Sequence, residues 1–187
     1  MLKKKVGRRD ILRMGLISAA AVLTNPRKTI ASIDSALITE RKLTIYNIHS
    51  DEYLKTVYWE DDHYIPDALA EINYMFRDRT TGKIKDIHPD LLDLLFEVQQ
   101  KLGYHKPIHI ISGYRTPKAN AYLKKTTKGV ARNSLHMYGK AVDIRLPGNS
   151  LNFVRRAATE LRRGGVGYYP HSNFVHLDIG TVRYWQG

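Results

Sequence analysis

Two short apolar segments in the C-terminal half of the chain carry ionisable residues in their interior, and any fold must give those residues a partner. Asp143 stands in Ala-Val-Asp-Ile, and His176 stands in Phe-Val-His-Leu-Asp178. The pattern of both segments predicts β-strands, and a carboxylate buried in a strand without a partner is costly. Because side chains alternate between the two faces of a strand, Asp178 is expected on the same face as His176.

Strand and helix patterns alternate along the rest of the chain. A polar link at 49–52 joins two β-rich runs and predicts a hairpin, and prolines open two later helices. Helices come early and short strands dominate later, which predicts an α+β fold with a small antiparallel central sheet flanked by helices. The expected strands are 43–48, 53–59, 107–111, 140–146, 166–169 and 174–179, and the expected helices are 66–76, 89–102, 117–125 and 150–163.

The first 31 residues have the pattern of an export signal. A basic start is followed by a short apolar run at 14–23, which is too short to span a bilayer. Arg8-Arg9 resembles the twin-arginine signal, with cleavage expected after Ala31. The alternatives are an uncleaved anchor and a basic segment lying on a membrane surface. We therefore expect a periplasmic protein exported by the twin-arginine route, with no stable membrane span once the leader is removed.

Residues 32–187 are expected to form one domain, with a strand-and-helix region at about 40–103 and a metal-site region at about 107–187. The chain has no cysteine, which excludes disulfides and thiolate metal sites. Its net charge is +12, but residues 1–31 account for +7, residues 32–100 for −7 and residues 101–187 for +12. A net charge of only +5 remains after the leader, and no nucleic-acid-reading motif is present, so a nucleic-acid partner is not expected.

Three residues have the chemistry of a metal site. His136 is followed seven positions later by Asp143, and His176 lies 33 positions beyond that. Imidazole and carboxylate groups are good zinc donors, and a catalytic zinc site has three protein ligands and one open position for water. A single histidine in a strand is more often a hydrogen-bonded core residue. The segment Ser112-Gly-Tyr-Arg115 adds a guanidinium directly after an apolar strand, either at the mouth of a site or in an ordinary surface ion pair.

These motifs together resemble a known family. SGYR, then Ser-x-His-x6-Asp, then GGVGYYP followed by FVHLD are similar to the zinc D,D-peptidase clan of peptidoglycan, which includes the VanX/VanY enzymes and the Hedgehog signalling domain. Within the clan the resemblance points to the murein endopeptidase K (YcbK/MepK-like) group and extends from the leader almost to Trp185. The resemblance implies a Hedgehog/D,D-peptidase-like fold.

The resemblance also implies roles for individual residues. His136, Asp143 and His176 would hold Zn²⁺, and Arg115 would face the scissile carbonyl and stabilise the oxyanion. Several relatives carry an Asp or Glu three positions before the last histidine, whereas this chain has Asn173. Asp178 would then act either as the general base or as an acceptor that orients a ligand histidine, and the sequence leaves both roles open.

The activity implied is zinc-dependent hydrolysis of the cross-links between peptidoglycan stem peptides, by a protein expected to be monomeric. The carboxylates of D-glutamate, diaminopimelate and terminal D-alanine would be attracted by the basic C-terminal half. Tyr168 and Tyr169 would either line the substrate cleft or pack in the core. The alternatives are a D,D- or L,D-carboxypeptidase and a non-catalytic, metal-containing cell-wall binding module. The best candidates for attracting the substrate are basic residues of the loop that leads to His136, namely Lys124, Lys125, Lys128 and Arg132.

Overall fold

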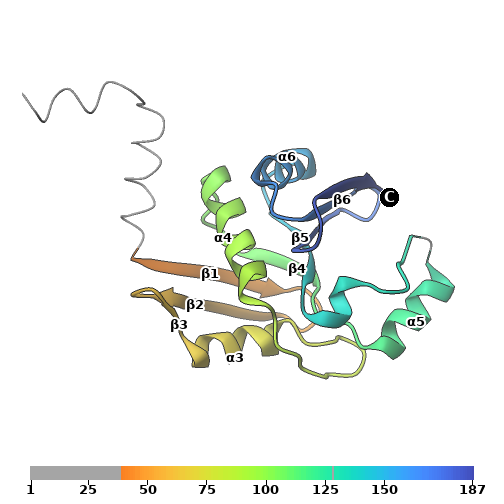
Figure 1. Ribbon diagram of the computed structural model, residues 1–187, viewed down its shortest axis with the longest axis horizontal. Helices are drawn as coiled ribbons and strands as arrows, with labels where there is room; N and C mark the ends of the chain where they lie inside the picture. The colour runs from red at the N-terminus through yellow and green to blue at the C-terminus, as the bar shows by residue number, and fades with distance from the viewer. Residues whose placement is uncertain (1–38, 128) are drawn as a thin grey trace, which may run out of the picture. The chain divides into compact units, whose positions relative to one another are not determined.

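One sheet of eight strands runs through residues 39–127 and 129–187, which are the residues that the computed structural model describes. The strand order is β3-β2-β1-β4-β5-β7-β6-β8 (Figure 1). The predicted leader lies outside the described residues, as does Lys128. The strands are β1 (Glu40–Asn47), β2 (Glu52–Glu60), β3 (His63–Tyr64), β4 (Ile108–Ser112), β5 (Ala141–Arg145), β6 (Gly165–Tyr169), β7 (Phe174–Asp178) and β8 (Arg183–Gln186).

The helices begin and end close to the predicted positions. Prolines occupy the first turn of three of them, where a missing N–H costs nothing, and Gly103 ends the second in the left-handed conformation. None of the helices in the described part of the chain combines the length and hydropathy of a membrane-spanning segment. They are α3 (Pro66–Met75), α4 (Pro89–Leu102), α5 (Pro117–Thr126) and α6 (Leu151–Leu161), with a short 3₁₀ helix, η1 (Leu135–Tyr138).

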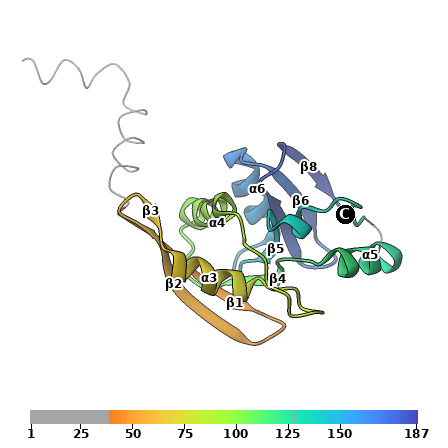
Figure 2. The ribbon, with the colours of Figure 1, turned by 60° about the horizontal axis from the view of Figure 1, so that its bottom comes forward.

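The α+β class is confirmed, but the sheet is mixed rather than purely antiparallel. Strands β1 and β4 are parallel, because α3 and α4 intervene and carry the chain back to start β4 in the direction of β1. Strands β6 and β8 are also parallel. Strand β7 runs antiparallel to β6, and the chain then turns again to add β8 on the other side of β6 (Figure 2). Neither β3 nor β8 was predicted from the sequence.

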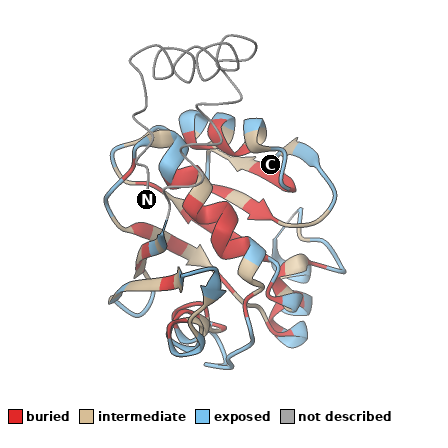
Figure 3. Cartoon of the chain, turned by 60° about the vertical axis from the view of Figure 1, so that its left-hand side comes forward, coloured by how far each residue is buried: buried red, intermediate tan, exposed pale blue. Residues whose placement is uncertain are grey.

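The apolar core is continuous and is enclosed by the sheet with α3, α4 and α6. Helix α4 is buried around most of its girth, as its sequence predicts, and Figure 3 shows the buried class along much of the central helix. In the C-terminal half of the sheet, every second residue enters this core. These core residues are Val142, Ile144, Val166, Val175 and Leu177. The intervening residues therefore face the opposite side of the sheet, where α6 does not lie.

Candidate metal centre

The strand register places the ionisable side chains of the C-terminal half in rows on that opposite face. Asp143 of β5 lies opposite His176 of β7. In the next strand pair, Ser112 of β4 lies opposite Asp143. Asp178 lies one row away from His176 on the same face, because the two residues are two positions apart in β7. Parts of the chain that are far apart in sequence therefore meet side by side.

His136 reaches the same place from the 3₁₀ helix η1. Its side chain is buried, and its Nδ1 lies 2.7 Å from the carbonyl oxygen of Gly113. A carbonyl oxygen only accepts hydrogen bonds, so Nδ1 carries the proton and Nε2 keeps a lone pair. The backbone N–H of Arg115 donates to the carbonyl oxygen of His136 at 3.2 Å. The Ser112–Arg115 segment thus fixes both the position and the tautomer of this histidine.

Three donor atoms converge at the centre of the site. Nε2 of His136 lies 3.2 Å from Nδ1 of His176 and 3.3 Å from Oδ1 of Asp143, and the last two atoms are 2.8 Å apart. His176 turns its other ring nitrogen, Nε2, toward Asp178 Oδ2 at 3.0 Å. Each imidazole therefore has one nitrogen turned outward, to Gly113 or Asp178, and one turned inward. His136, Asp143 and His176 form a group that can hold a metal ion.

The electrostatics of the group favour a positive charge between these side chains. Burial opposes ionisation of Asp143, but His136 and His176 hold the pKa of that carboxyl well below its usual range. Burial also lowers the pKa of His136. Burial on its own would also lower the pKa of His176, but the hydrogen bonds to Asp143 and Asp178 outweigh it and raise that pKa to about 9. A cation at the centre would supply the same positive charge, and its binding would displace a proton from His176.

Asp178 is fully buried behind His176 and both of its oxygens are occupied. Arg183 donates to Oδ1 at 3.0 Å and to Oδ2 at 2.6 Å, and the backbone N–H groups of Gly180 and Gly165 donate to Oδ1. Burial works against the charge, but these donors and His176 hold the pKa of Asp178 well below its usual range. A Cβ atom at Gly165 would lie 2.4 Å from Asp178 Oδ2, so only glycine leaves room for this carboxylate.

Arg115 lies beside the metal-holding group without entering it. Its Nη2 is 3.6 Å from Asp143 Oδ2 and 3.2 Å from the hydroxyl of Ser112, and its Nη1 donates to Asn120 Oδ1 at 3.3 Å. The side chain is 13% exposed. The guanidinium is therefore held in one orientation while part of it remains accessible, as expected for a group that meets a substrate.

The two tyrosines predicted at the cleft lie on opposite faces of β6. Tyr169 faces the metal centre, where its hydroxyl accepts from Trp185 Nε1 at 2.9 Å and its ring stacks on Phe174. Tyr168 lies opposite the core residue Val175 and packs under Arg155 of α6. Of the two, only Tyr169 is positioned to reach a substrate, because neighbouring residues of a strand point to opposite sides.

Two residues that contact the site, Arg183 and Trp185, were not predicted from the sequence. Arg183, which fixes Asp178, comes from the unpredicted strand β8, and Trp185 of the same strand packs against His176 with ring centroids 5.2 Å apart. The sequence signal for strand β8 is weak, because the strand is only four residues long and its pattern is limited to the spacing of Arg183 and Trp185 two positions apart. Lys124 and Lys125, predicted to attract the substrate, lie exposed in the last turn of α5, and Arg132 is exposed as well.

Comparison with known proteins places this geometry in context. Residues 35–185 match the protein family described as peptidoglycan L,D-endopeptidase MepK. The peptidoglycan L,D-endopeptidase MepK proteins of Escherichia coli and Shigella flexneri are each 40% identical over 185 residues, which covers 99% of this chain and all of theirs. The zinc D-Ala-D-Ala carboxypeptidase of Streptomyces albus G is 30% identical over 128 residues, covering 63% of this chain and 47% of that protein.

Proposed function

The chain belongs to the family of peptidoglycan L,D-endopeptidases described as MepK, and from this we propose that it is a zinc-dependent murein endopeptidase that hydrolyses amide cross-links between stem peptides. The relatives' name specifies L,D cross-links, and we propose that linkage for this chain. The observation that carries the proposal is the convergence of two imidazole nitrogens and one carboxylate oxygen, with the other nitrogen of each ring held by an acceptor outside the group.

Zinc fits the donor set in type and in spacing. Two imidazole nitrogens and one carboxylate oxygen are usual zinc ligands, with bonds of about 2.0–2.2 Å. A tetrahedral ion with such bonds separates its ligand atoms by about 3.3 Å, and the observed separations are 2.8–3.3 Å. We propose His136, Asp143 and His176 as the ligands, with the fourth position left for water or substrate.

A zinc ion bound there would supply a Lewis acid that polarises the scissile carbonyl and makes a coordinated water more acidic. The surrounding side chains position the substrate around it. Arg115 offers its guanidinium to the negative charge that develops on the carbonyl oxygen, from a partly desolvated position where such a contact is strong. The Tyr169 hydroxyl accepts from Trp185, which leaves its own hydrogen to donate to a substrate carbonyl.

For Asp178 we propose the orienting role rather than that of general base. A general base must reach the proton that it removes, whereas Asp178 has no exposed surface and accepts from Arg183, His176 and two backbone amides. It instead keeps the proton of His176 on Nε2, so that Nδ1 is free to bind the ion. Such outer partners commonly contribute 10-fold to 100-fold to metal affinity.

Digestion of purified sacculi tests the proposal. The zinc-loaded protein is expected to release peptides cut at the L,D cross-link, identified by mass, and a chelator is expected to stop the release. Trimming of the terminal residue without loss of cross-links would instead indicate a carboxypeptidase. Stoichiometric zinc binding with no product of either kind would indicate a non-catalytic binding module and overturn the proposal.

The site of action follows from the substrate. Peptidoglycan lies outside the cytoplasmic membrane, so we propose that residues 1–31 direct export to the periplasm by the twin-arginine route. The paired Arg8-Arg9 motif supports this route. Replacing both arginines by lysine should retain the protein in the cytoplasm, as judged by cell fractionation, whereas unchanged export would contradict the proposed route.

A further inference from the structure

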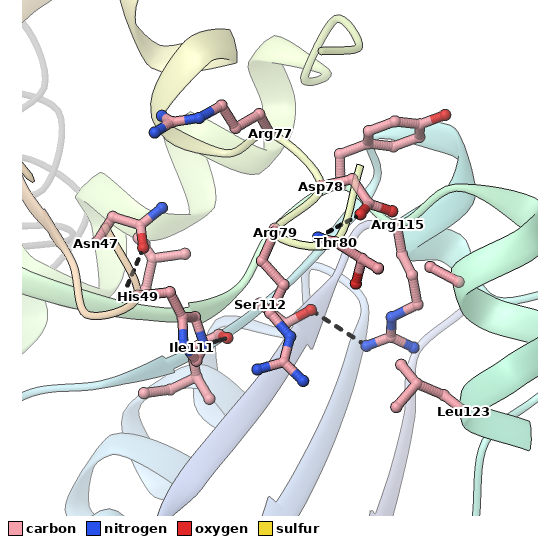
Figure 4. A pocket seen from close by; sticks show the side chains of 14 residues that line it. Asn47, His49, Arg77, Asp78, Arg79, Thr80, Ile111, Ser112, Arg115 and Leu123 are labelled. Carbon is pink, nitrogen blue, oxygen red and sulfur yellow. Dashed lines mark hydrogen bonds between the residues drawn. The ribbon is translucent and has the colours of Figure 1, made fainter. Parts of the chain in front are cut away.

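A small pocket lies next to the metal centre and is rich in cationic side chains (Figure 4). Its walls come from the loop after α3, the end of β4 and the first turns of α5. Ser112 and Arg115 line it, and Arg115 also reaches Asp143, so one guanidinium separates the pocket from the proposed zinc ligands. The cavity volume of about 40 Å³ has room for about three water-sized groups, which is the size of a carboxylate.

Arginine side chains outnumber carboxylates among the residues that line the pocket. Arg77 forms an ion pair with Glu52, with 2.6 Å between Nη2 and Oε2, so its charge already has a partner. Both carboxylate oxygens of Asp78 accept hydrogen bonds from backbone N–H groups. The N–H groups of Thr80 and Thr81 donate to Oδ1, and that of Thr116 donates to Oδ2. Among the residues that the structure describes, no carboxylate lies within ion-pair distance of Arg79.

Arg79 and Arg115 are close enough to influence each other. Figure 4 shows both side chains in the pocket beside Ser112, and Arg115 donates to the hydroxyl of Ser112 at 3.2 Å. Burial lowers the pKa of Arg115. The charges of Asp143 and Asp78 oppose this shift, and the positive charge of Arg79 acts more weakly in the same direction as burial. Asp143 and Asp78 offset part of the repulsion between the two guanidinium groups, and a bound anion would offset more of it. The hydroxyl of Ser112 adds a hydrogen-bond donor at the same place.

The backbone of the loop that carries Arg79 is held in place, and the Arg79 side chain is exposed. The backbone N–H of Tyr114 donates to the carbonyl oxygen of Phe76 at 2.7 Å, and Asp78 ties the loop to Thr116 at 2.6 Å. A Cβ atom at Gly113 would lie 2.5 Å from the Phe76 carbonyl oxygen, so glycine is needed for this close approach. The loop is thus anchored to the segment that holds both Arg115 and His136, and the backbone around the pocket is preformed.

We propose that this pocket is a carboxylate-binding subsite, in which Arg79, Arg115 and Ser112 hold a substrate carboxylate adjacent to the scissile amide. The inference rests on the proposed function and names the part of the substrate that the enzyme reads. A cross-link that ends on the amine of diaminopimelate leaves a free carboxylate on the very carbon that bears the scissile nitrogen. The carboxylate is therefore close to the scissile amide, as required if the amide lies at the metal centre and the carboxylate in the pocket, with Arg115 beside both.

Two synthetic cross-linked peptide dimers test the subsite, one with this carboxylate free and one with it converted to a carboxamide. The zinc-loaded wild-type protein should show a kcat/KM at least about 10-fold higher for the acid, since each bidentate charged contact is strong. Arg79→Gln should lose at least about 10-fold on the acid, mainly through KM, and less than 2-fold on the amide. Lys85→Gln, which removes one exposed charge from the same loop region, should retain the wild-type preference.

An equal loss on both dimers in Arg79→Gln, or a wild-type protein that cleaves both dimers equally, would overturn the inference. Binding separates this failure from failure of the proposed function. In calorimetry on the chelator-treated full chain, the acid dimer should bind at least about 5-fold more tightly than the amide, and Arg79→Gln should abolish the difference. Equal binding of the two dimers to the wild type would refute the subsite whether or not the protein cleaves either one.

Discussion

Two buried aspartates, Asp93 and Asp143, have neighbours of opposite kinds. Asp93 of α4 receives three donors, one from each of the first three strands: Arg41 at 2.7 Å, Tyr58 at 3.0 Å and Tyr64 at 2.8 Å. Asp143 of β5 instead faces ring nitrogens of two histidines whose other nitrogens face Gly113 and Asp178. The first carboxylate is satisfied by three fixed donors, whereas the charge of the second is balanced by a proton on His176 that a metal ion could replace.

This difference separates a structural cluster from the cluster that we propose to be functional. Burial alone does not distinguish the two aspartates, which are 7% and 6% exposed. The polarity of the neighbours does, because a buried polar group is stable only when its partners are complementary. The Asp93 cluster is complete, so it should contribute to stability and not to activity. The Asp143 cluster needs a positive charge, supplied by a proton on His176 or by a metal ion, so we expect it to contribute mainly to activity and metal binding.

The largest effect is expected from His136→Ala. Loss of one ligand should remove the ion and, with it, several kcal/mol of transition-state stabilisation, which corresponds to about 1000-fold or more in turnover. Metal content after dialysis and release of peptides from sacculi measure the two losses, and circular dichroism monitors the fold. His63→Ala, at an exposed position in β3, is the control. A His136→Ala protein that keeps one equivalent of metal would contradict the proposed ligand set.

Arg115→Ala should separate activity from metal binding within the functional cluster. The guanidinium lies 3.6 Å from Asp143 but is not a ligand, so the zinc content should remain unchanged. Turnover should fall by about 100-fold to 1000-fold, as for loss of an oxyanion donor. Parallel measurement of kcat and of bound zinc checks this division. Loss of the ion would show that Arg115 instead maintains the geometry of Asp143.

Asp178→Asn distinguishes the orienting role from the general base. Loss of the carboxylate should weaken zinc binding by about 10-fold to 100-fold, because His176 is no longer held by a charged acceptor. Competition with a chromophoric chelator measures the affinity. Arg183→Gln should produce a smaller change in the same direction, since it acts on Asp178 from behind. Full zinc affinity combined with abolished turnover in Asp178→Asn would favour the general base.

Tyr58→Phe should affect stability alone. It removes a 3.0 Å hydrogen bond to Asp93 from a side chain with no exposed surface, at a cost of about 1–3 kcal/mol in the free energy of unfolding. Urea unfolding of the zinc-loaded protein measures this cost. Zinc affinity and kcat should remain at wild-type values, and a change in either would show that the two clusters are coupled.

The smallest effect is expected at alkaline pH. Burial, followed by the hydrogen bond to Asp93, raises the pKa of Tyr64 to about 12, against about 10 in an unfolded chain. The neutral phenol is favoured in the folded state, so its contribution to stability is complete below pH 10 and is lost as the pH rises from 10 to 12. Urea unfolding at pH 9 and pH 11 should show a smaller decrease in Tyr64→Phe than in the wild type. An identical decrease would contradict the assignment.

Local patterns predicted most of the elements and the face on which the site residues lie. Helix α4 and the β1–β2 hairpin follow from apolar periodicity and turn residues, and the proximity of Asp178 to His176 follows from alternation within one strand. The convergence of Asp143 and His176 required no more than antiparallel pairing of two apolar segments.

The features that the sequence did not reveal depend on contacts between distant segments. Strand β8 consists of four residues and is defined by pairing with β6, so it has little signal of its own. The parallel β1–β4 contact depends on how far two helices carry the chain. Asp178 is buried because Arg183 of β8 binds both of its oxygens. The pocket beside Arg115 forms because the loop that carries Arg79 is tied to Tyr114 and Thr116. None of these is encoded in local spacing.

The proposed zinc ligands all come from residues 136–176, and the β1–β4 contact joins this part of the sheet to the N-terminal hairpin. Withdrawal of the ion should therefore speed amide hydrogen exchange in β5 and β7 while β1 and β2 exchange as before. Since the first three strands contribute none of the proposed ligands, we expect the hairpin side of the sheet to keep its fold while the ion exchanges.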